Sequence, residues 1–190
     1  MFGWSKAKRI QKENAFSLYM ACVKQARHPA FYKDLGVADT MEGRFEMICL
    51  HASLLVEFLY SVGEEKLAQT VFDVMFVDID RNMREEGVGD LAVSKRIKKM
   101  MQGFKGRATA YKGGLETSDL NLVIERNIGA TDPRIISCFV DYIEQAYAHV
   151  KTIPVATAMK TPEILFLADG DIINILGTIN EQKNRSNSAA

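Results

Sequence analysis

Residues 41–62 constrain the fold most, because apolar side chains surround nearly the whole circumference of the helix that this segment predicts. Asp39 and Glu42 have the spacing of a capping box at its start, and Gly63 ends it. A helix that is apolar on every side belongs in the middle of a bundle. We therefore predict a central helix whose buried residues include Phe45, Ile48, Leu50, Leu54, Leu55, Val56, Phe58 and Leu59.

The rest of the chain contains residues that are typical of helix starts and ends. It shows neither the apolar–polar alternation of strands nor an internal repeat. Pro29 disfavours helical geometry at His28 and so ends a first helix. Gly87 suits the end of one helix. Starts of other helices are indicated by Asp90, Ser118, Thr131 with Pro133, and Thr161 with Pro162. The predicted helices cover residues 5–27, 41–62, 64–86, 91–112, 118–128 and 131–151, with a last one from residue 161.

These elements predict an all-α fold: a single-domain bundle of six or seven helices with a long ordered loop between the first two. The domain covers residues 1–180, and residues 181–190 form a polar, disordered tail. The loop over residues 28–40 places Phe31, Tyr32, Leu35 and Val37 in a non-helical segment. There they either plug the bundle or face a partner.

Composition excludes several classes of protein. Lys plus Arg and Asp plus Glu are equal at 24 each, so bulk charge predicts no specific binding of nucleic acid. The three cysteines lie far apart among apolar neighbours, which predicts buried reduced thiols and neither disulfides nor a metal site. No apolar run reaches the roughly 18–20 residues that span a bilayer.

The first residues, MFGWSKAKRIQK, show no secretory or transit signal, which predicts a cytoplasmic protein. Phe2 and Trp4 stand beside the bases Lys6, Lys8, Arg9 and Lys12. This combination either contacts an anionic membrane surface peripherally or forms a solvated helix start.

Charge changes sign abruptly at the Gly87–Gly89 break. Residues 64–90 carry eight acids and three bases, whereas residues 91–113 carry seven bases and no acid. We predict a helix hairpin bent at this break, in which a stripe from Val93 to Tyr111 is buried and Lys95, Lys98, Lys99, Lys105 and Lys112 face away. The basic face is either merely solvated or steers a partner.

Catalytic signals are weak, and we predict neither an enzyme nor a bound cofactor. The GVGD stretch follows a helix and lacks the third glycine of a dinucleotide loop. Asp78 and Asp80 resemble one half of the aspartate-rich metal site of prenyl-transferring enzymes, yet Arg81 and Arg84 lie close enough to pair with them. His51 is expected to be a hydrogen-bonded core residue. The alternative functions are a metal-dependent enzyme that acts on an isoprenoid-like substrate through Asp78 and Asp80, and a general membrane-surface binding module.

Four stretches together resemble the ubiquinol–cytochrome c chaperone family, the assembly factors of the cytochrome bc1 complex. They are ARHPAFYKDLGVADTMEGRFEMICLH (residues 26–51), FDVMFVDIDRNMREEGVGDLAVSKRIKKM (72–100), FKGRATAY (104–111) and ERNI (125–128). The resemblance implies an all-α, non-enzymatic, bacterial-type chaperone that binds and holds newly made cytochrome b. It also implies a small partner chaperone and contact with the ribosome exit region.

The resembling stretches are densest around the loop and the hairpin, so we predict one partner-binding surface there. Its members are Phe31, Tyr32, Gly36, Asp39, Arg44, Arg84, Glu85, Gly87, Gly89, Asp90, Lys95, Lys99, Arg107 and Tyr111.

Overall fold

A computed structural model describes residues 2–175 of the chain, and the side chains from residue 6 onward. The predicted tail and any contact made by Phe2 and Trp4 therefore lie outside the described part. Residues 2–175 contain helices and no strand, which confirms the all-α fold. The helices are α1 (Phe2–Ala26), α2 (Pro29–Lys33), α3 (Met41–Ser61), α4 (Glu65–Glu85), α5 (Asp90–Thr117), α6 (Asn121–Ile128), α7 (Pro133–Thr152), α8 (Val155–Lys160) and the 3₁₀ turn η1 (Pro162–Ile164).

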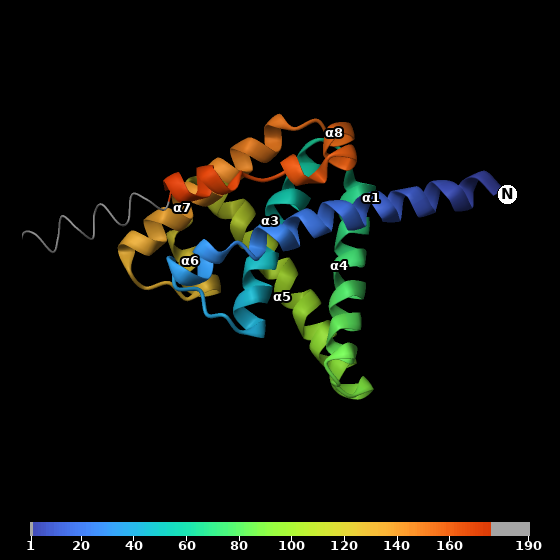
Figure 1. Cartoon of the computed structure of the whole chain (residues 1–190), viewed down its shortest axis with the longest axis horizontal. Helices are drawn as coiled ribbons and strands as arrows, with labels where there is room; N and C mark the ends of the chain where they lie inside the picture. Colours follow the sequence, from blue (N-terminus) through green and yellow to red (C-terminus); the bar gives the residue numbers. More distant parts are fainter. Residues whose placement is uncertain (1, 176–190) are drawn as a thin grey trace, which may run out of the picture.

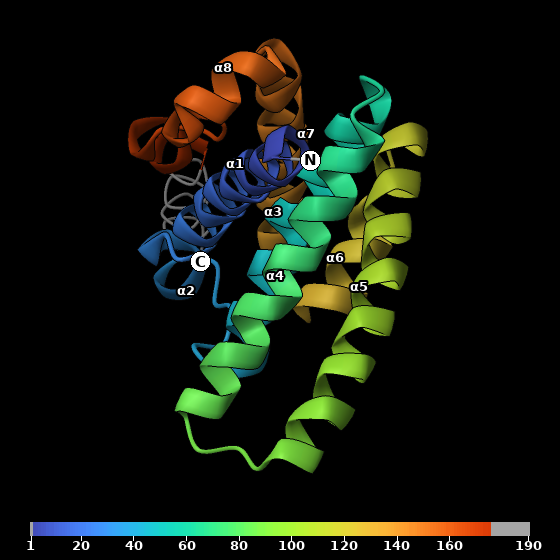
Figure 2. The same cartoon turned by 90° about the vertical axis from the view of Figure 1, so that its right-hand side faces the viewer.

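Helix α3 lies at the centre of the bundle, as its apolar circumference predicts. It packs against α1, α4, α5, α6 and α7. Helices α1 and α5 lie on opposite sides of the molecule, with α3 and α4 between them (Figures 1 and 2). Leu50, Leu54, Leu55 and Leu59 of α3 are almost completely buried. The centre is therefore apolar on all sides, and the neighbouring helices need only one apolar stripe each.

The segment between α1 and α3 plugs the bundle and includes the short helix α2, where the sequence predicted a loop. Phe31 is fully buried. Its ring stacks on Phe139 of α7 and meets Tyr142 edge-on, with ring centroids 6.3 and 4.9 Å apart. Burial of such a side chain contributes about 1.5–3 kcal/mol. Leu35 and Val37 are buried in the same cluster, so the apolar residues of this segment face inward.

A buried histidine joins three helices. His51 of α3 contacts the backbone oxygen of Met47 through Nδ1 at 2.7 Å and the Tyr142 hydroxyl of α7 through Nε2 at 2.6 Å. Gln25 of α1 donates to the same hydroxyl at 3.1 Å. Because a carbonyl only accepts, Nδ1 carries the proton and Nε2 accepts from Tyr142. His51 is thus the hydrogen-bonded core residue that the sequence predicted.

Several helix starts differ from the predicted caps. Thr40, not Asp39, caps α3, because its hydroxyl accepts from the amide of Gly43 at 3.1 Å. Helix α5 starts at Asp90 itself, with Gly89 as the cap residue. It then continues to Thr117, past the predicted end at residue 112. At each start, the local backbone path decides which neighbouring polar residue can reach a free amide.

The second half of the chain shows three further corrections. Ser118 closes α5 in a left-handed conformation and does not open the next helix, whose preceding residue is Leu120. Asp132, not Thr131, caps α7. The helix predicted from Thr161 is a single 3₁₀ turn, and helix resumes only over residues 169–175. Burial of Phe166, whose ring meets His51 edge-on at 5.2 Å, accompanies this interruption.

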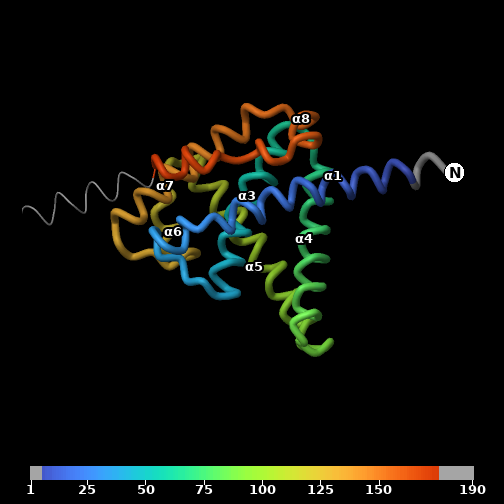
Figure 3. Tube along the Cα trace, in the orientation of Figure 1, coloured from blue at the N-terminus to red at the C-terminus, as the bar shows by residue number. Residues whose placement is uncertain are grey.

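The α4–α5 hairpin extends beyond the rest of the bundle. Its closed end lies well past the start of α3, as the Cα trace shows (Figure 3). Gly87 at the bend has φ +83°, a left-handed conformation that glycine adopts without strain. The hairpin bent at Gly87–Gly89 is therefore as predicted, and its projection leaves a corner between the hairpin and α3.

Candidate functional site

Two adjoining hollows occupy the corner between the first turns of α3 and the projecting hairpin. The first has a volume of about 820 Å³ and opens beside α5; we call it the α5-side hollow. The second, the α1-side hollow, has a volume of about 580 Å³ and opens beside the second half of α1. Both hollows share the lining residues Met41, Phe45, Met83 and Met100, which we call the methionine groove.

The groove exists because the apolar stripes of α4 and α5 continue past the start of α3. Met83 is nearly buried between the two hairpin helices, whereas Phe45 and Met100 are half-buried and Met41 is 44% exposed. Methionine is unbranched and polarizable, so its side chain adapts to irregular apolar surfaces. The corner thus presents adaptable apolar surface that no helix of the described chain covers.

A half-buried ion pair forms the wall of the α5-side hollow. Arg107 of α5 donates through Nε to Glu46 of α3 at 2.5 Å, and its second guanidinium nitrogen contacts the other carboxylate oxygen. Hydrogen bonding to Glu46 raises the pKa of Arg107. A Cβ on Gly103 would lie 2.7 Å from Nη1 of Arg107, so this glycine makes room for the guanidinium. The pair ties α5 to α3 beside the groove.

Unpaired cations complete that wall. Arg96 and Lys99 of α5 line the hollow, and Lys95 lies exposed one turn from Lys99. Among the described residues, no carboxylate lies within ion-pair distance of these three side chains. Their charge is therefore available to a partner, since exposed side chains of this kind contribute little to the fold.

The α1-side hollow has a different character. Asp39 and Arg44 form an exposed ion pair of 2.6 Å at its mouth. Deeper inside, Tyr19 of α1 donates to the buried Asp78 of α4 at 3.1 Å. Burial and the neighbouring Asp78 charge raise the pKa of Tyr19. This hollow is more polar, and acidic Glu85 and Glu86 of the hairpin lie along its edge.

The carboxylates considered for metal binding are engaged with basic or polar neighbours. Asp78 accepts from Arg81 and from Asn82 in addition to Tyr19. Asp80 pairs with Arg84 at 2.6 Å, as the spacing predicted. Within residues 2–175 no group of three or more histidine, cysteine, aspartate or glutamate side chains is placed to hold a metal ion. All three cysteines are buried, as their apolar neighbours in the sequence predicted.

The structure brings together only part of the predicted partner-binding surface. Asp39, Arg44, Glu85, Lys99 and Arg107 line the two hollows. Arg84 and Asp90 pair at the closed end of the hairpin, where Gly87 and Gly89 form the bend. Lys95 points outward, and the exposed Gly36 turns the backbone at φ +70° before α3.

Two members of the predicted surface belong to the core instead. Phe31 is fully buried and Tyr111 is 1% exposed, because both fill the cluster between α2, α3 and α7. Tyr32 is half-buried, and its hydroxyl donates to the Ala26 backbone oxygen at 2.8 Å. Phe31 and Tyr32 thus hold the α2 segment against the bundle, and the buried side chains of Phe31 and Tyr111 present almost no surface to a partner.

Sequence reasoning missed the floor of the groove. In the sequence, Met83 and Met100 fall on the apolar sides of their helices, and Met41 stands at the start of one. Periodicity shows which side of a helix is apolar, but it does not show where the neighbouring helix ends. The sequence does contain a usable signal: the apolar stripes on both sides of Gly87–Gly89 continue as far as the bend. A third helix that stops short of the bend leaves part of these stripes uncovered.

Comparison with known proteins gives two matches. The family described as ubiquinol-cytochrome C chaperone matches residues 33–165 of this chain. A crystal structure of the Cbp3 homolog from Brucella abortus matches with a TM-score of 0.72 at 29% sequence identity. That match covers 87% of this chain and 94% of the Brucella chain. No curated protein matches.

Proposed function

The chain belongs to the ubiquinol-cytochrome C chaperone family, and we propose that it holds newly made cytochrome b during assembly of the cytochrome bc1 complex. The family match and the likeness to the Brucella structure support a chaperone role. Cytochrome b as the client is our proposal, as is the absence of catalysis. The observation that carries the proposal is the open methionine groove beside a wall of unpaired cations.

An unfinished membrane protein exposes apolar helix faces that need temporary cover. The methionine groove offers such cover without a rigid shape, because Met41 and Met100 can change rotamer to fit different side chains. Each hollow is open on one side, so it suits one face of a client helix and not its whole circumference. We therefore assign client binding to the groove and not to the buried aromatic cluster.

The charges around the groove are arranged to orient a client. Arg96 and Lys99 form one wall, whereas Glu85 and Glu86 lie across the hairpin on the other side. Cytoplasmic loops of membrane proteins are rich in Lys and Arg. A positive loop is attracted to the acidic side and repelled from the basic wall, so the client helix enters in one direction. The basic wall then faces acidic groups or the negative carboxyl end of that helix.

The cellular setting follows from the same proposal. No helix within residues 2–175 is long and apolar enough to cross a membrane. We propose that the chaperone works on the cytoplasmic side of the inner membrane, where cytochrome b is inserted. A small partner chaperone and the ribosome exit region, which the resemblance implies, remain predictions.

Charge reversal tests this proposal. Lys95→Glu with Lys99→Glu should lower the amount of cytochrome b captured from solubilised membranes severalfold, because the orienting wall is lost. The matched control is Lys33→Glu with Lys160→Glu, two exposed lysines on α2 and α8. Helical content by circular dichroism should not change in either variant. Equal capture by both double variants would remove the basic wall of α5 from the proposed function.

A further inference from the structure

The outer face of α1 has an amphipathic pattern that neither the bundle nor the groove uses. At 100° per residue, positions 6, 9, 10, 16, 20 and 24 fall within an arc of about 120° and so lie along one side of the helix. Ala15, Leu18 and Cys22 on the opposite side are buried against the bundle. The outer face, as we define it, consists of Lys6, Arg9, Ile10, Phe16, Met20 and Lys24.

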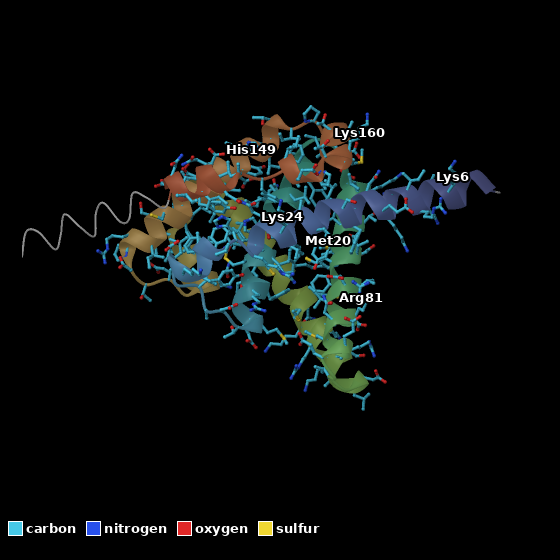
Figure 4. All side chains as sticks on the ribbon, viewed as in Figure 1. Lys6, Met20, Lys24, Arg81, His149 and Lys160 are labelled. Atoms are coloured by element: carbon cyan, nitrogen blue, oxygen red, sulfur yellow. The ribbon has the colours of Figure 1, made fainter. Side chains whose placement is uncertain are left out.

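Apolar side chains are exposed along this face. Ile10 is 43% exposed, and Phe16 and Met20 are 39% exposed each. They stand between cations, with Lys6 and Arg9 at one end and Lys24 at the other. Figure 4 shows Lys6, Met20 and Lys24 in a row along α1. Exposed apolar groups at helical spacing among bases are typical of a helix that lies on a lipid surface.

The charge of α1 supports the same partner. The helix carries five bases and one acid in a chain whose net charge is zero. The acid, Glu13, lies 3.5 Å from Arg9, and both side chains are largely exposed. Lys and Arg near an anionic leaflet each strengthen binding, whereas a neutral leaflet gives them no such gain.

The position of α1 makes the face accessible. Its first half extends away from the bundle, and α1 lies opposite α5 (Figures 1 and 2). Side-chain hydrogen bonds hold α1 from two neighbours: Gln11 donates to Thr70 of α4 at 3.2 Å, and Asn14 contacts Met159 of α8 at 3.4 Å. The helix is therefore fixed with one side turned to solvent. A surface bound to α1 would leave the basic wall of α5 free.

We propose that the outer face of α1 docks the protein on an anionic phospholipid surface. The bases contact lipid headgroups, and Ile10, Phe16 and Met20 insert at the boundary with the acyl chains. Nucleic acid is the less favoured polyanion, because it would gain little from exposed Ile10 and Met20. This inference does not depend on the identity of the client, and it can fail or hold independently of the groove.

Vesicle flotation with the full chain tests the inference. The probes are vesicles of phosphatidylcholine alone and vesicles of phosphatidylcholine with phosphatidylglycerol in equal parts. The parent should bind only the second kind, and added salt should weaken binding. Reversing three charges, as Lys6→Glu, Arg9→Glu and Lys24→Glu, should weaken binding by about tenfold or more.

Two further variants make the result specific. Lys95→Glu, Lys98→Glu and Lys105→Glu make the same change in net charge on the opposite side and should lower binding by less than about twofold. Phe16→Ser with Met20→Ser removes apolar contacts without changing charge and should also weaken binding. Equal loss in the two charge variants would overturn the inference, as would binding to neutral vesicles. Displacement by RNA together with unchanged binding of the serine variant would show a polyanion site instead.

Discussion

At the scale of single residues, the buried imidazole of His51 sets a limit on stability at low pH. Its ring contacts Met47 and Tyr142 and is surrounded by the rings of Phe31 and Phe166. Burial lowers the pKa of His51 from its ordinary 6.5 to about 4. Protonation would put a charge into this apolar cluster and would replace the acceptor that Tyr142 needs.

The contribution of His51 to the free energy of unfolding should therefore fall as pH falls from about 6.5 to 4 and level off below. In this window the unfolded chain binds a proton that the folded chain does not, which costs up to about 3 kcal/mol. Urea unfolding of the parent and of His51→Leu measures the effect as the difference in their pH dependence. His149→Gln, which changes a histidine outside this cluster, is the matched control for the loss of a histidine. An unchanged pH dependence in His51→Leu would show that another group is responsible.

At the scale of elements, close approach of the 36–40 segment to α3 depends on Gly43. A Cβ there would lie 2.0 Å from the backbone oxygen of Ala38. A backbone atom cannot rotate away as a side chain can, so the loop would have to move. Thr40 caps the same turn by accepting a hydrogen bond from the amide of Gly43. Asp39 and Arg44, which line the α1-side hollow, flank this turn. The shape of the hollow is thus coupled to one glycine.

Alanine at two glycines should have opposite effects. Gly43→Ala should lower the free energy of unfolding by about 1–3 kcal/mol, because the added methyl meets the backbone of the loop. Gly106→Ala, in the middle of α5 with open space around its Cα, should raise it by about 0.5–1 kcal/mol through helix propensity. Thermal and urea unfolding measure both. A stabilised Gly43→Ala variant would contradict the close packing of loop and helix.

Most helices were predictable from the sequence, because the period of the apolar residues indicates a helix, and glycine and proline indicate where it starts or ends. The central position of α3 and the bend at Gly87–Gly89 followed in this way. The caps at Thr40 and Asp132 were not predictable, because several polar residues compete for the same free amides within two positions. The inward path of Phe31 was one of two predicted outcomes, since a loop aromatic fits a core or a partner equally well until its neighbours are placed.

At the scale of the whole molecule, different surfaces suit different tasks. The methionine groove lies in the corner between α3 and the hairpin, the basic wall belongs to α5, and the outer face of α1 lies on the opposite side (Figures 1 and 2). The candidate site could be predicted only in part, because it arises where the hairpin of α4 and α5 projects past the start of α3. Its charged rim was visible in the sequence, whereas its apolar floor resembled ordinary core.

Site-specific photo-crosslinking from the groove tests the central claim most directly. A photoreactive residue at position 41 should form crosslinks to cytochrome b while that protein is being made, because Met41 is exposed on the floor of the groove. The same residue at position 122 is the control, since Leu122 is an exposed apolar residue of α6 that lines neither hollow. The account predicts cytochrome b peptides from position 41 and few from position 122. Equal yields from the two positions, or no cytochrome b from position 41, would contradict it.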